Sequence, residues 1–239
     1  MKSYNLNTTA MKKLLFLLAC ASVFCGCGEK QVVLEAPLGE AVYTHNFISS
    51  FVKADNLEIA QDANDPLVFY IRDVDMSYVS SVIRDALYKK YSDTTYDRYV
   101  AQDPSRSMCY VNEFNSIDIT SSADFGAIKA GESLASIVIF RGASAKPYID
   151  YEYKVCGEWT NEIKAEIGEY GMNLLRNNLE YHPIVKRVAD LTPNNLILLT
   201  PKFVSLRFME TPDIKKHTLY VSIKDDENVY RVEVNAVFP

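Results

Sequence analysis

The sequence predicts an α+β, mainly β fold: an antiparallel, sandwich-like domain with two or three helical insertions. About eight or nine segments have strand character, and only a few have helical spacing. The clearest strands alternate apolar and polar residues, which is typical of a sheet packed on one side and solvated on the other. Hydrophobic residues make up 48% of the 239 residues and charged residues 23%, as in ordinary globular proteins.

The N-terminus has the features of a secretory signal peptide over residues 1–26. A positive start at Met11-Lys12-Lys13 precedes an apolar run over 14–24, and the segment ends at Cys25-Gly26-Cys27. That run is too short for a membrane-spanning helix, which needs about 20 residues. We therefore exclude 1–26 from the fold. The polar residues before Met11 add nothing to the signal, so Met11 is an alternative start of translation.

The end of this signal resembles the lipobox of bacterial lipoproteins, in which a cysteine after a small residue becomes the acylated N-terminus. Cys27 follows Gly26 and has a full-length apolar run before it, whereas Cys20 has the better local string, 17–19, but a shorter run. We favour Cys27 as the lipid anchor, with Cys20 as the alternative. Two or three acyl chains, such as palmitate, would attach the protein stably to a membrane.

The charge of the chain argues against nucleic acid as a partner. Residues 1–26 contain three lysines and no acidic residue, so the chain from Cys27 has 22 basic and 31 acidic residues and a net charge of −9. An acidic surface repels both nucleic acid and anionic lipid headgroups.

Two cysteines remain in the body after the signal, Cys109 and Cys156. Export would expose them to an oxidising compartment, where a disulfide between them is plausible. The alternative is two buried thiols, because sequence alone does not give the distance between the two Cα atoms.

The first half is expected to begin with a tether over 27–36, followed by a single domain over 37–239. Apolar spacing within 39–53 allows a short amphipathic helix, and the apolar run 67–71 predicts a strand. A helix capped by Ser77 follows. Its apolar stripe, expected to face the core, consists of Val79, Val82, Ile83, Ala86 and Leu87.

The middle of the chain contains four runs with strand character, separated by turns with Ser, Gly or Pro. These runs are 108–114, 116–120, 134–140 and 148–155. Thr160 then caps a helix that extends to Leu174, in which Gly168 and Gly171 each lower helix propensity by about 1 kcal/mol relative to alanine.

The C-terminal third has the clearest pattern. Two strands are expected at 195–200 and 203–208. The last residues, 217–239, form a hairpin in which Leu219, Val221 and Ile223 alternate with polar residues before a turn over 225–228.

Catalytic and metal-binding motifs are missing, so we expect no catalytic residue, metal or cofactor. His45, His182 and His217 lie far apart in sequence, and the last two are expected at the surface or at element boundaries. Gly131-Glu132-Ser133 begins like a nucleophile elbow but lacks its closing glycine. Asp73 and Asp75 could pair as carboxylates, although capping explains them as well. The acidic run 225–228 resembles part of a calcium loop, but turn chemistry explains it better.

Four tyrosines form a possible partner surface: Tyr88, Tyr91, Tyr96 and Tyr99. They run from the side of the first helix opposite or flanking its apolar stripe into a polar loop. Exposed tyrosine is enriched at interfaces, and exposed aromatic rings bind the faces of sugars. Scattered surface aromatics are the ordinary alternative.

Several of these features together resemble uncharacterised cell-envelope lipoproteins of Bacteroidetes-type bacteria. The resemblance is carried by the lipobox-like start, by 116–120 followed by Phe125 and 130–134, and by the terminal hairpin. It implies an address rather than an activity: the bacterial cell envelope, with a lipid in the outer membrane and a soluble body in the periplasm or at the cell surface. In that setting Asp93-Thr94-Thr95 also resembles an O-glycosylation motif, with Thr94 as the acceptor.

Three functions remain open at this point. The first is a non-enzymatic, lipid-anchored protein that binds a protein or glycan partner. The second is a fimbrial or envelope-assembly subunit that pairs through an edge strand, for which the terminal strand 230–238 is the candidate. The third is a hydrolase that uses carboxylates such as Asp73 and Asp75.

Overall fold

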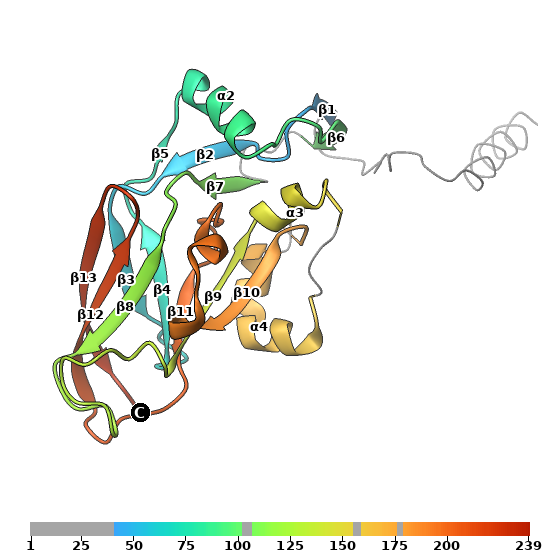
Figure 1. The fold of residues 1–239 in the computed structure, drawn as a ribbon. Helices are drawn as coiled ribbons and strands as arrows, with labels where there is room; N and C mark the ends of the chain where they lie inside the picture. Colours follow the sequence, from blue (N-terminus) through green and yellow to red (C-terminus); the bar gives the residue numbers. More distant parts are fainter. Residues whose placement is uncertain (1–40, 102–106, 155–158, 176–178) are drawn as a thin grey trace, which may run out of the picture. The chain divides into compact units, whose positions relative to one another are not determined.

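The computed structural model describes residues 41–101, 107–154, 159–175 and 179–239 (Figure 1). Its elements, in chain order, are β1 (Ala41–Thr44), β2 (Ser50–Lys53), β3 (Leu57–Gln61), β4 (Val68–Asp73), β5 (Ser77–Tyr78), α2 (Ser81–Lys90), β6 (Arg98–Ala101), β7 (Met108–Tyr110), β8 (Ser116–Ser121), β9 (Val138–Ser144), α3 (Lys146–Asp150), α4 (Asn161–Leu175), β10 (His182–Arg187), η1 (Val188–Asp190), η2 (Pro193–Leu196), β11 (Ser205–Phe208), β12 (Lys216–Lys224) and β13 (Val229–Val237).

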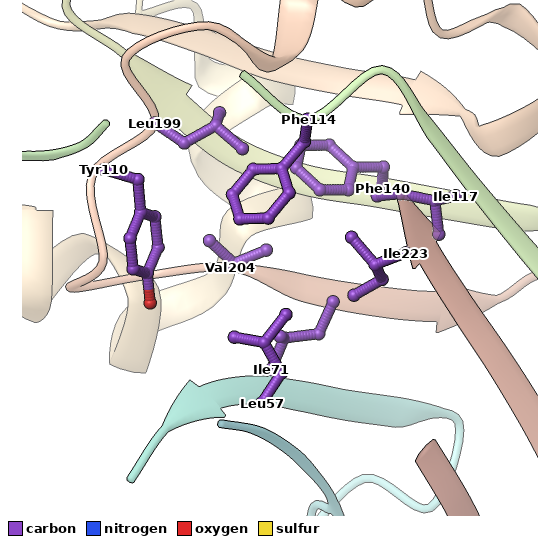
Figure 2. A pocket seen from close by; sticks show the side chains of 9 residues that line it. All are labelled: Leu57, Ile71, Tyr110, Phe114, Ile117, Phe140, Leu199, Val204 and Ile223. Carbon is purple, nitrogen blue, oxygen red and sulfur yellow. The ribbon is translucent and has the colours of Figure 1, made fainter. Parts of the chain in front are cut away.

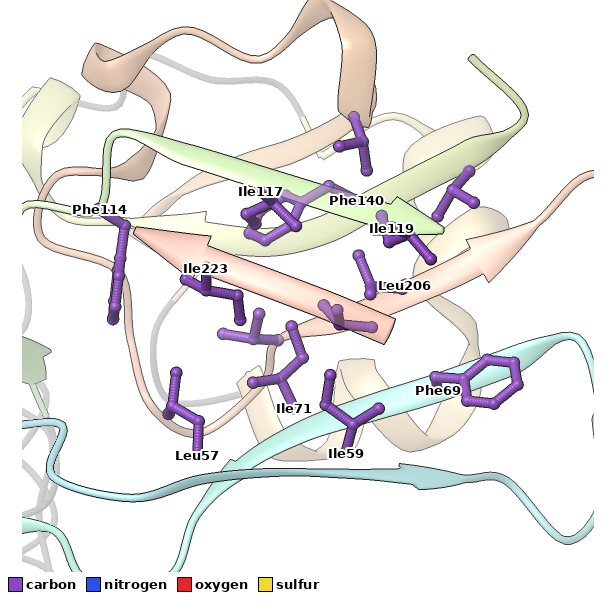
Figure 3. Close-up of a cluster of buried hydrophobic side chains, with 14 of the residues drawn as sticks. Leu57, Ile59, Phe69, Ile71, Phe114, Ile117, Ile119, Phe140, Leu206 and Ile223 are labelled. Atoms are coloured by element: carbon purple, nitrogen blue, oxygen red, sulfur yellow. The ribbon is translucent and has the colours of Figure 1, made fainter. Parts of the chain in front are cut away.

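Two antiparallel sheets face each other and enclose the main hydrophobic core. One has five strands in the order β10-β9-β11-β4-β3, and the other has three in the order β13-β12-β8. Figure 3 shows the side chains between them: Ile117 and Ile119 from β8 and Ile223 from β12 point toward Ile71 and Phe140 of the larger sheet. The predicted α+β, mainly β, sandwich-like architecture is confirmed.

The C-terminal hairpin forms as its alternation predicts. β12 and β13 pair along all nine residues of each strand, and the odd-numbered residues of β12 from His217 to Ile223 are buried. Asp225 closes the turn, because its Oδ1 accepts the N–H groups of Glu227 at 2.9 Å and Asn228 at 2.6 Å. This is the turn chemistry expected of the acidic run.

The other face of the five-stranded sheet is covered by a second core that includes α3 and α4. The predicted cap of α4 is present, since Thr160 Oγ1 accepts the N–H of Ile163 at 3.3 Å. The helix breaks at Gly168, whose φ of +76° a residue with a side chain rarely adopts. Gly171 lets the helix approach Phe203, because a Cβ there would lie 2.6 Å from the ring.

A buried carboxylate fixes the chain between β1 and β2. Asp93 is fully buried, and its oxygens accept the backbone N–H groups of Phe47 at 2.7 Å and Ile48 at 2.9 Å, together with the Tyr153 hydroxyl at 3.0 Å. Burial raises the pKa of Asp93, although the bonds from Ile48, Phe47 and Tyr153 oppose that rise. One side chain thus joins three segments that are distant in sequence.

The prediction of a short helix within 39–53 is wrong. The segment forms β1 and β2 instead, and β2 lies between β5 and β7. Phe51 and Val52 are therefore both buried although they point to opposite sides of the strand. A strand covered on both faces carries consecutive apolar residues, which imitate helical spacing.

The prediction of a strand over 148–155 is also wrong, because the end of α3 and a turn occupy this region. Pro147 lies in the first turn of α3, where its missing N–H has no helical partner to lose. The expected common face is divided: Tyr151 is 63% exposed, whereas Tyr153 is buried with a φ of +59°.

Other differences concern the part of the chain from residue 134 onward, which contributes β9, β10 and β11 to the five-stranded sheet. The strand expected at 134–140 begins later, as β9. The segment 195–200 is not a strand, because its first two residues belong to η2, where Thr192 and Asn195 make a capping box. The sequence interpretation missed β10, an edge strand on which Pro183 is tolerated because edge positions need fewer ladder bonds.

The predicted helix in the first half exists as α2, but most of the side predicted to face the core is exposed instead. Ser80 caps it instead of Ser77. The stripe expected to face the core lies largely in solvent, with Val82 79% and Ile83 52% exposed. The helix is held instead by Tyr88, whose ring lies 5.4 Å from that of Phe51.

Asp93→Asn tests the role of the buried carboxylate. An amide places an N–H₂ group against a backbone N–H, so we expect the free energy of unfolding to fall by about 1–3 kcal/mol. Denaturant unfolding measures this loss. Asp190→Asn is the control, because Asp190 is exposed and its replacement should change stability by less than about 0.5 kcal/mol. Equal effects of the two variants would contradict the assigned role.

Candidate functional site

The four tyrosines expected at a partner surface are divided by the fold. Tyr91 and Tyr96 are buried, with 4% and 7% of their surface exposed, so their prediction as surface residues is wrong. Tyr91 turns inward because its hydroxyl donates to Glu113 at 2.9 Å. Tyr88 is half-buried, and its hydroxyl donates to a backbone carbonyl of the 45–49 segment at 3.0 Å. Tyr99 alone of the four is clearly exposed, at 56%.

Tyr99 belongs to a small aromatic group on the two-stranded sheet of β1 and β6. It is opposite Tyr43 in the register, and their ring centroids lie 5.1 Å apart. His45 packs against the other edge of Tyr43, also at 5.1 Å, and its Nδ1 is 2.6 Å from Asp97 Oδ1. The exposed aromatic surface therefore exists, but with different members from those expected.

Cys109 is a free thiol and is fully buried, which contradicts the expected disulfide. It lies in β7, with its Sγ 3.3 Å from the Tyr181 hydroxyl oxygen. Burial raises the pKa of the thiol. Cys156, its expected partner, lies outside the described residues.

The predicted signal peptide, the anchor Cys27, its alternative Cys20, the start at Met11 and the tether over 27–36 also lie outside the described residues. Thr94 lies within them and is exposed, while the preceding Asp93 is buried. O-glycosylation at Thr94 stays a prediction.

The paired carboxylates Asp73 and Asp75 organise the turn after β4. Asp73 Oδ1 accepts the N–H groups of Asn56 at 3.3 Å and Asp75 at 3.2 Å, and Asn56 Nδ2 donates to Asp75 Oδ2 at 3.3 Å. Burial raises the pKa of Asp73. These contacts are those of a turn, and they supply no second catalytic group.

The motif Gly131-Glu132-Ser133 also has a structural role. Gly131 has a φ of +82°, and Ser133 Oγ donates to Asp118 Oδ1 at 2.5 Å. The backbone N–H groups of Gly131 and Leu134 donate to carbonyls of β8. The segment covers one edge of the three-stranded sheet.

The structure brings together one pair that the sequence interpretation missed, Ser121 and His217. Ser121 Oγ lies 2.5 Å from His217 Nδ1, and His217 Nε2 lies 2.7 Å from the carbonyl oxygen of Ile214. His217 is only 3% exposed, so its prediction as a surface or boundary residue is wrong. The rings of Phe125 and Phe238 cover the imidazole. A serine and histidine enclosed in this way cannot reach a substrate.

Metal ligation finds no support in the described ranges, where no three His, Cys, Asp or Glu side chains come together. His182 is partly buried, which lowers its pKa.

The main core contains one apolar cavity, shown in Figure 2. It has about 20 Å³ of free space, roughly enough for one water molecule. Among its lining residues only Tyr110 carries a polar group (Figure 2). An apolar cavity of this size is a packing defect that holds no ligand.

A larger hollow of about 200 Å³ lies on the three-stranded sheet. Its lining combines an aromatic ring, two acidic groups, one guanidinium and two hydroxyls. Its main side chains are Asp118 and Thr120 of β8, Tyr220 and Ser222 of β12, and Arg231 and Glu233 of β13. We call these six residues the sheet hollow.

The strand register arranges the sheet hollow in two rows. Asp118, Ser222 and Arg231 form one row across the sheet, and Thr120, Tyr220 and Glu233 form the next. Side chains in such rows point to the same face, and directly opposite residues have Cβ atoms about 4.5–5.5 Å apart. Tyr220, 43% exposed, is thus bordered by polar groups on both sides.

Among the described residues, most polar groups of the sheet hollow have no protein partner. Asp118 accepts the bond from Ser133, but Tyr220, Arg231 and Glu233 make no side-chain hydrogen bond or ion pair there. The backbones of β8, β12 and β13 are paired in one sheet. The hollow can therefore offer both donors and acceptors to a polar ligand.

The edge strand β13, the candidate for assembly through strand pairing, is engaged at one end of its outer edge. There the side chain of Gln61 bonds both the N–H and the carbonyl of Val237 at 3.0 Å. Pairing of another chain with this end of β13 would have to displace these contacts.

Some residues of the sheet hollow could be predicted from the sequence. The alternation of the hairpin predicts the solvent-facing side chains of β12 and β13. What the sequence interpretation did not use is the same alternation in 116–120, where Ser116, Asp118 and Thr120 are polar. Together with the pairing of β8 to β12, this places two more polar side chains on the same face.

Comparison with protein-family models, with curated proteins and with solved structures finds no match, so what the chain does is inferred from its own residues. No helix among those described is long and apolar enough to cross a membrane.

Glu113 provides a pH-dependent test of how α2 is attached. Burial alone would raise its pKa, but bonds from Lys90 and Tyr91, each 2.9 Å long, outweigh burial and lower the pKa below its ordinary value. A group with a lowered folded-state pKa stabilises the fold above its unfolded-state pKa, and this stabilisation is lost as the pH falls. We expect Glu113→Gln to cost about 0.2–1 kcal/mol at neutral pH.

The difference between Glu113→Gln and the native protein should shrink as the pH falls below about 4.3, where glutamate becomes protonated in the unfolded chain. Denaturant unfolding across this pH range measures it. Glu210→Gln, at an exposed position, should show no such trend. A difference that stays constant with pH would show that the carboxylate charge of Glu113 does not matter.

Proposed function

We propose that the protein is a non-enzymatic, lipid-anchored module of the bacterial cell envelope that binds a glycan through the sheet hollow. The observation that carries this proposal is the open row of polar side chains around Tyr220, with Arg231 and Glu233 lacking partners within the described residues. Polar side chains that stand on paired strands and have no partner within the protein are available to a ligand.

The chemistry of the sheet hollow suits a sugar. A tyrosine face covers the apolar C–H face of a sugar ring, while its hydroxyl stays hydrated. Arg231 offers several N–H donors in a fixed plane, and the carboxylates of Asp118 and Glu233 accept from sugar hydroxyls. The volume of about 200 Å³ is below the roughly 300–1,000 Å³ of pockets for drug-sized ligands, so it suits one sugar unit of a longer chain.

The alternatives have less support. For a carboxylate hydrolase, Asp73 and Asp75 are engaged in a turn. For an assembly subunit, the outer backbone groups of Val237 in β13 are already bonded to Gln61. A protein partner at the sheet hollow is the remaining competitor, and the binding experiment below separates it from a glycan.

Glycan binding is tested with the purified full-length protein on an array of bacterial and host polysaccharides, followed by calorimetric titration of the best ligand. We expect Tyr220→Ala and Arg231→Ala each to weaken binding about tenfold or more, since a bond to a charged group contributes about 1.5–3 kcal/mol and 1.4 kcal/mol is tenfold.

Lys216→Ala is the matched control, because Lys216 is an exposed residue of β12 that does not line the sheet hollow. It should bind normally. Unchanged affinity in both Tyr220→Ala and Arg231→Ala would overturn the proposed site. Failure of every glycan, with capture of one defined protein that these variants lose, would favour the protein partner.

The lipid anchor has its own test. We expect Cys27→Ala to prevent acylation, so that the protein expressed in an envelope-containing bacterium loses the mass of the acyl chains and leaves the detergent phase on partitioning. Cys20→Ala should keep both properties. The opposite result would move the anchor to Cys20, and no acyl mass in the native protein would remove the anchor.

A further inference from the structure

One end of the described body presents apolar side chains that the fold does not use. Six of them are large and exposed: Val42 43%, Tyr43 45%, Tyr78 65%, Val82 79%, Ile83 52% and Tyr99 56%. They come from β1, β5, α2 and β6. We call them the apical surface.

Hydrogen bonds link the elements that carry most of the apical surface. At the end of α2, the carbonyl of Tyr88 accepts the N–H of Asp93 at 2.9 Å, and the carbonyl of His45, next to β1, accepts the N–H of Tyr96 at 2.9 Å. Asn46 also bonds the carbonyl of Asp93. Figure 1 shows α2, β1 and β6 together at one end of the sandwich.

α2 is attached in a way that leaves Val82 and Ile83 outward. Tyr88 fixes the inner side of the helix to Phe51 and to the carbonyl of Ile48, and none of the ten helical residues is buried. Val82 and Lys89 are seven residues apart, as are Ile83 and Lys90, so these lysines lie on the same side of the helix as the exposed apolar residues. Lysines beside apolar side chains can keep their stems on an apolar surface while their ammonium groups reach lipid headgroups.

The charges and aromatic rings of this end fit a lipid surface. α2 contains three basic residues, Arg84, Lys89 and Lys90, and one acidic residue, Asp85. Lys90 is paired with Glu113 at 2.9 Å, so Arg84 and Lys89 leave a small excess of positive charge on α2 although the chain as a whole is acidic. Basic residues near a bilayer are attracted to anionic headgroups. Tyr43 and Tyr99 stack edge to face at 5.1 Å, and exposed tyrosine is typical of the headgroup level of membranes.

The position of β1, where the described body begins, favours a membrane over a protein as the partner of the apical surface. β1 begins at Ala41, and Val42 and Tyr43 of the apical surface follow directly. If Cys27 carries the lipid, 13 residues separate it from Ala41, and such a segment reaches at most about 45 Å. The apical surface then stays near the bilayer at a high effective concentration, so weak contacts are sufficient.

We propose that the apical surface docks on the membrane that holds the lipid anchor, with α2 lying in the headgroup region. This inference rests on the lipid anchor of the proposed function. Docking by this end leaves the sheet hollow, which is on a different sheet, available to its ligand.

The test uses the full-length, lipidated protein in vesicles of phosphatidylethanolamine with a minority of phosphatidylglycerol. A fluorophore sensitive to its environment is attached to Ile83→Cys in a Cys156→Ser background, while the native Cys109 is buried and unreactive. We expect a blue shift and brighter emission on the vesicles. Ile214→Cys is the control, because Ile214 is similarly exposed, at 47%, in the loop before β12, and its emission should not change.

Val82→Asp in the labelled Ile83→Cys protein should abolish the shift, while circular dichroism confirms that the exposed substitution leaves the fold intact. Water-like emission at both labelled positions, in protein that floats with the vesicles, would overturn docking but keep the anchor. A label at Ile83→Cys already shielded before vesicles are added would also overturn docking, since the chain itself would then cover the surface. Protein that does not float would instead show that the anchor fails.

Discussion

The structure depends on covering both faces of the five-stranded sheet. A sheet strand places alternate side chains on opposite faces, so a sheet whose strands are apolar on both faces is stable only between two layers. One layer is the sheet of β8, β12 and β13. The other is the second core, with α3, α4 and the aromatic rings around Phe47, which Asp93 and Tyr153 hold in place.

This requirement explains where the polar groups lie. The three-stranded sheet covers the larger sheet with one face only, so its other face stays in solvent and carries the sheet hollow. The second layer is built from short segments, and their backbone groups need buried polar partners. Asp93 meets that need for Phe47 and Ile48. In the three-stranded sheet, the 131–134 segment bonds carbonyls at the free edge of β8.

The parts of the fold that the sequence predicts are those set by local pattern. The hairpin of β12 and β13 follows from alternation and from the turn chemistry of Asp225, which operate within a few residues. The predictions for the segment 39–53 and for the buried side of α2 were wrong for the same reason. Their apolar residues are arranged by neighbours distant in the chain, so Phe51 and Val52 are both buried, while Val82 and Ile83 are left exposed.

The same distinction applies to the site. Tyr220, Arg231 and Glu233 could be assigned to a solvent-facing side from alternation alone, but the hollow requires β8 as a neighbour, which pairs with β12 over a long separation in the chain. Tyr91 and Tyr96 were misassigned because the chain after α2 folds back over the second core. Periodicity within a helix cannot show what covers the loop that follows it.

The burial of Cys109 has a consequence for the proposed export of the protein to an oxidising compartment. Thiol–disulfide exchange and oxidation to sulfenic acid both proceed through the thiolate. Burial raises the pKa of Cys109 and Tyr181 closes its surroundings, so the folded body offers almost no reactive sulfur there. An unfolded chain has no such protection. If the chain is exported as proposed, β7 would have to be enclosed before oxidants reach its thiol, and folding would be the step that makes Cys109 chemically inert.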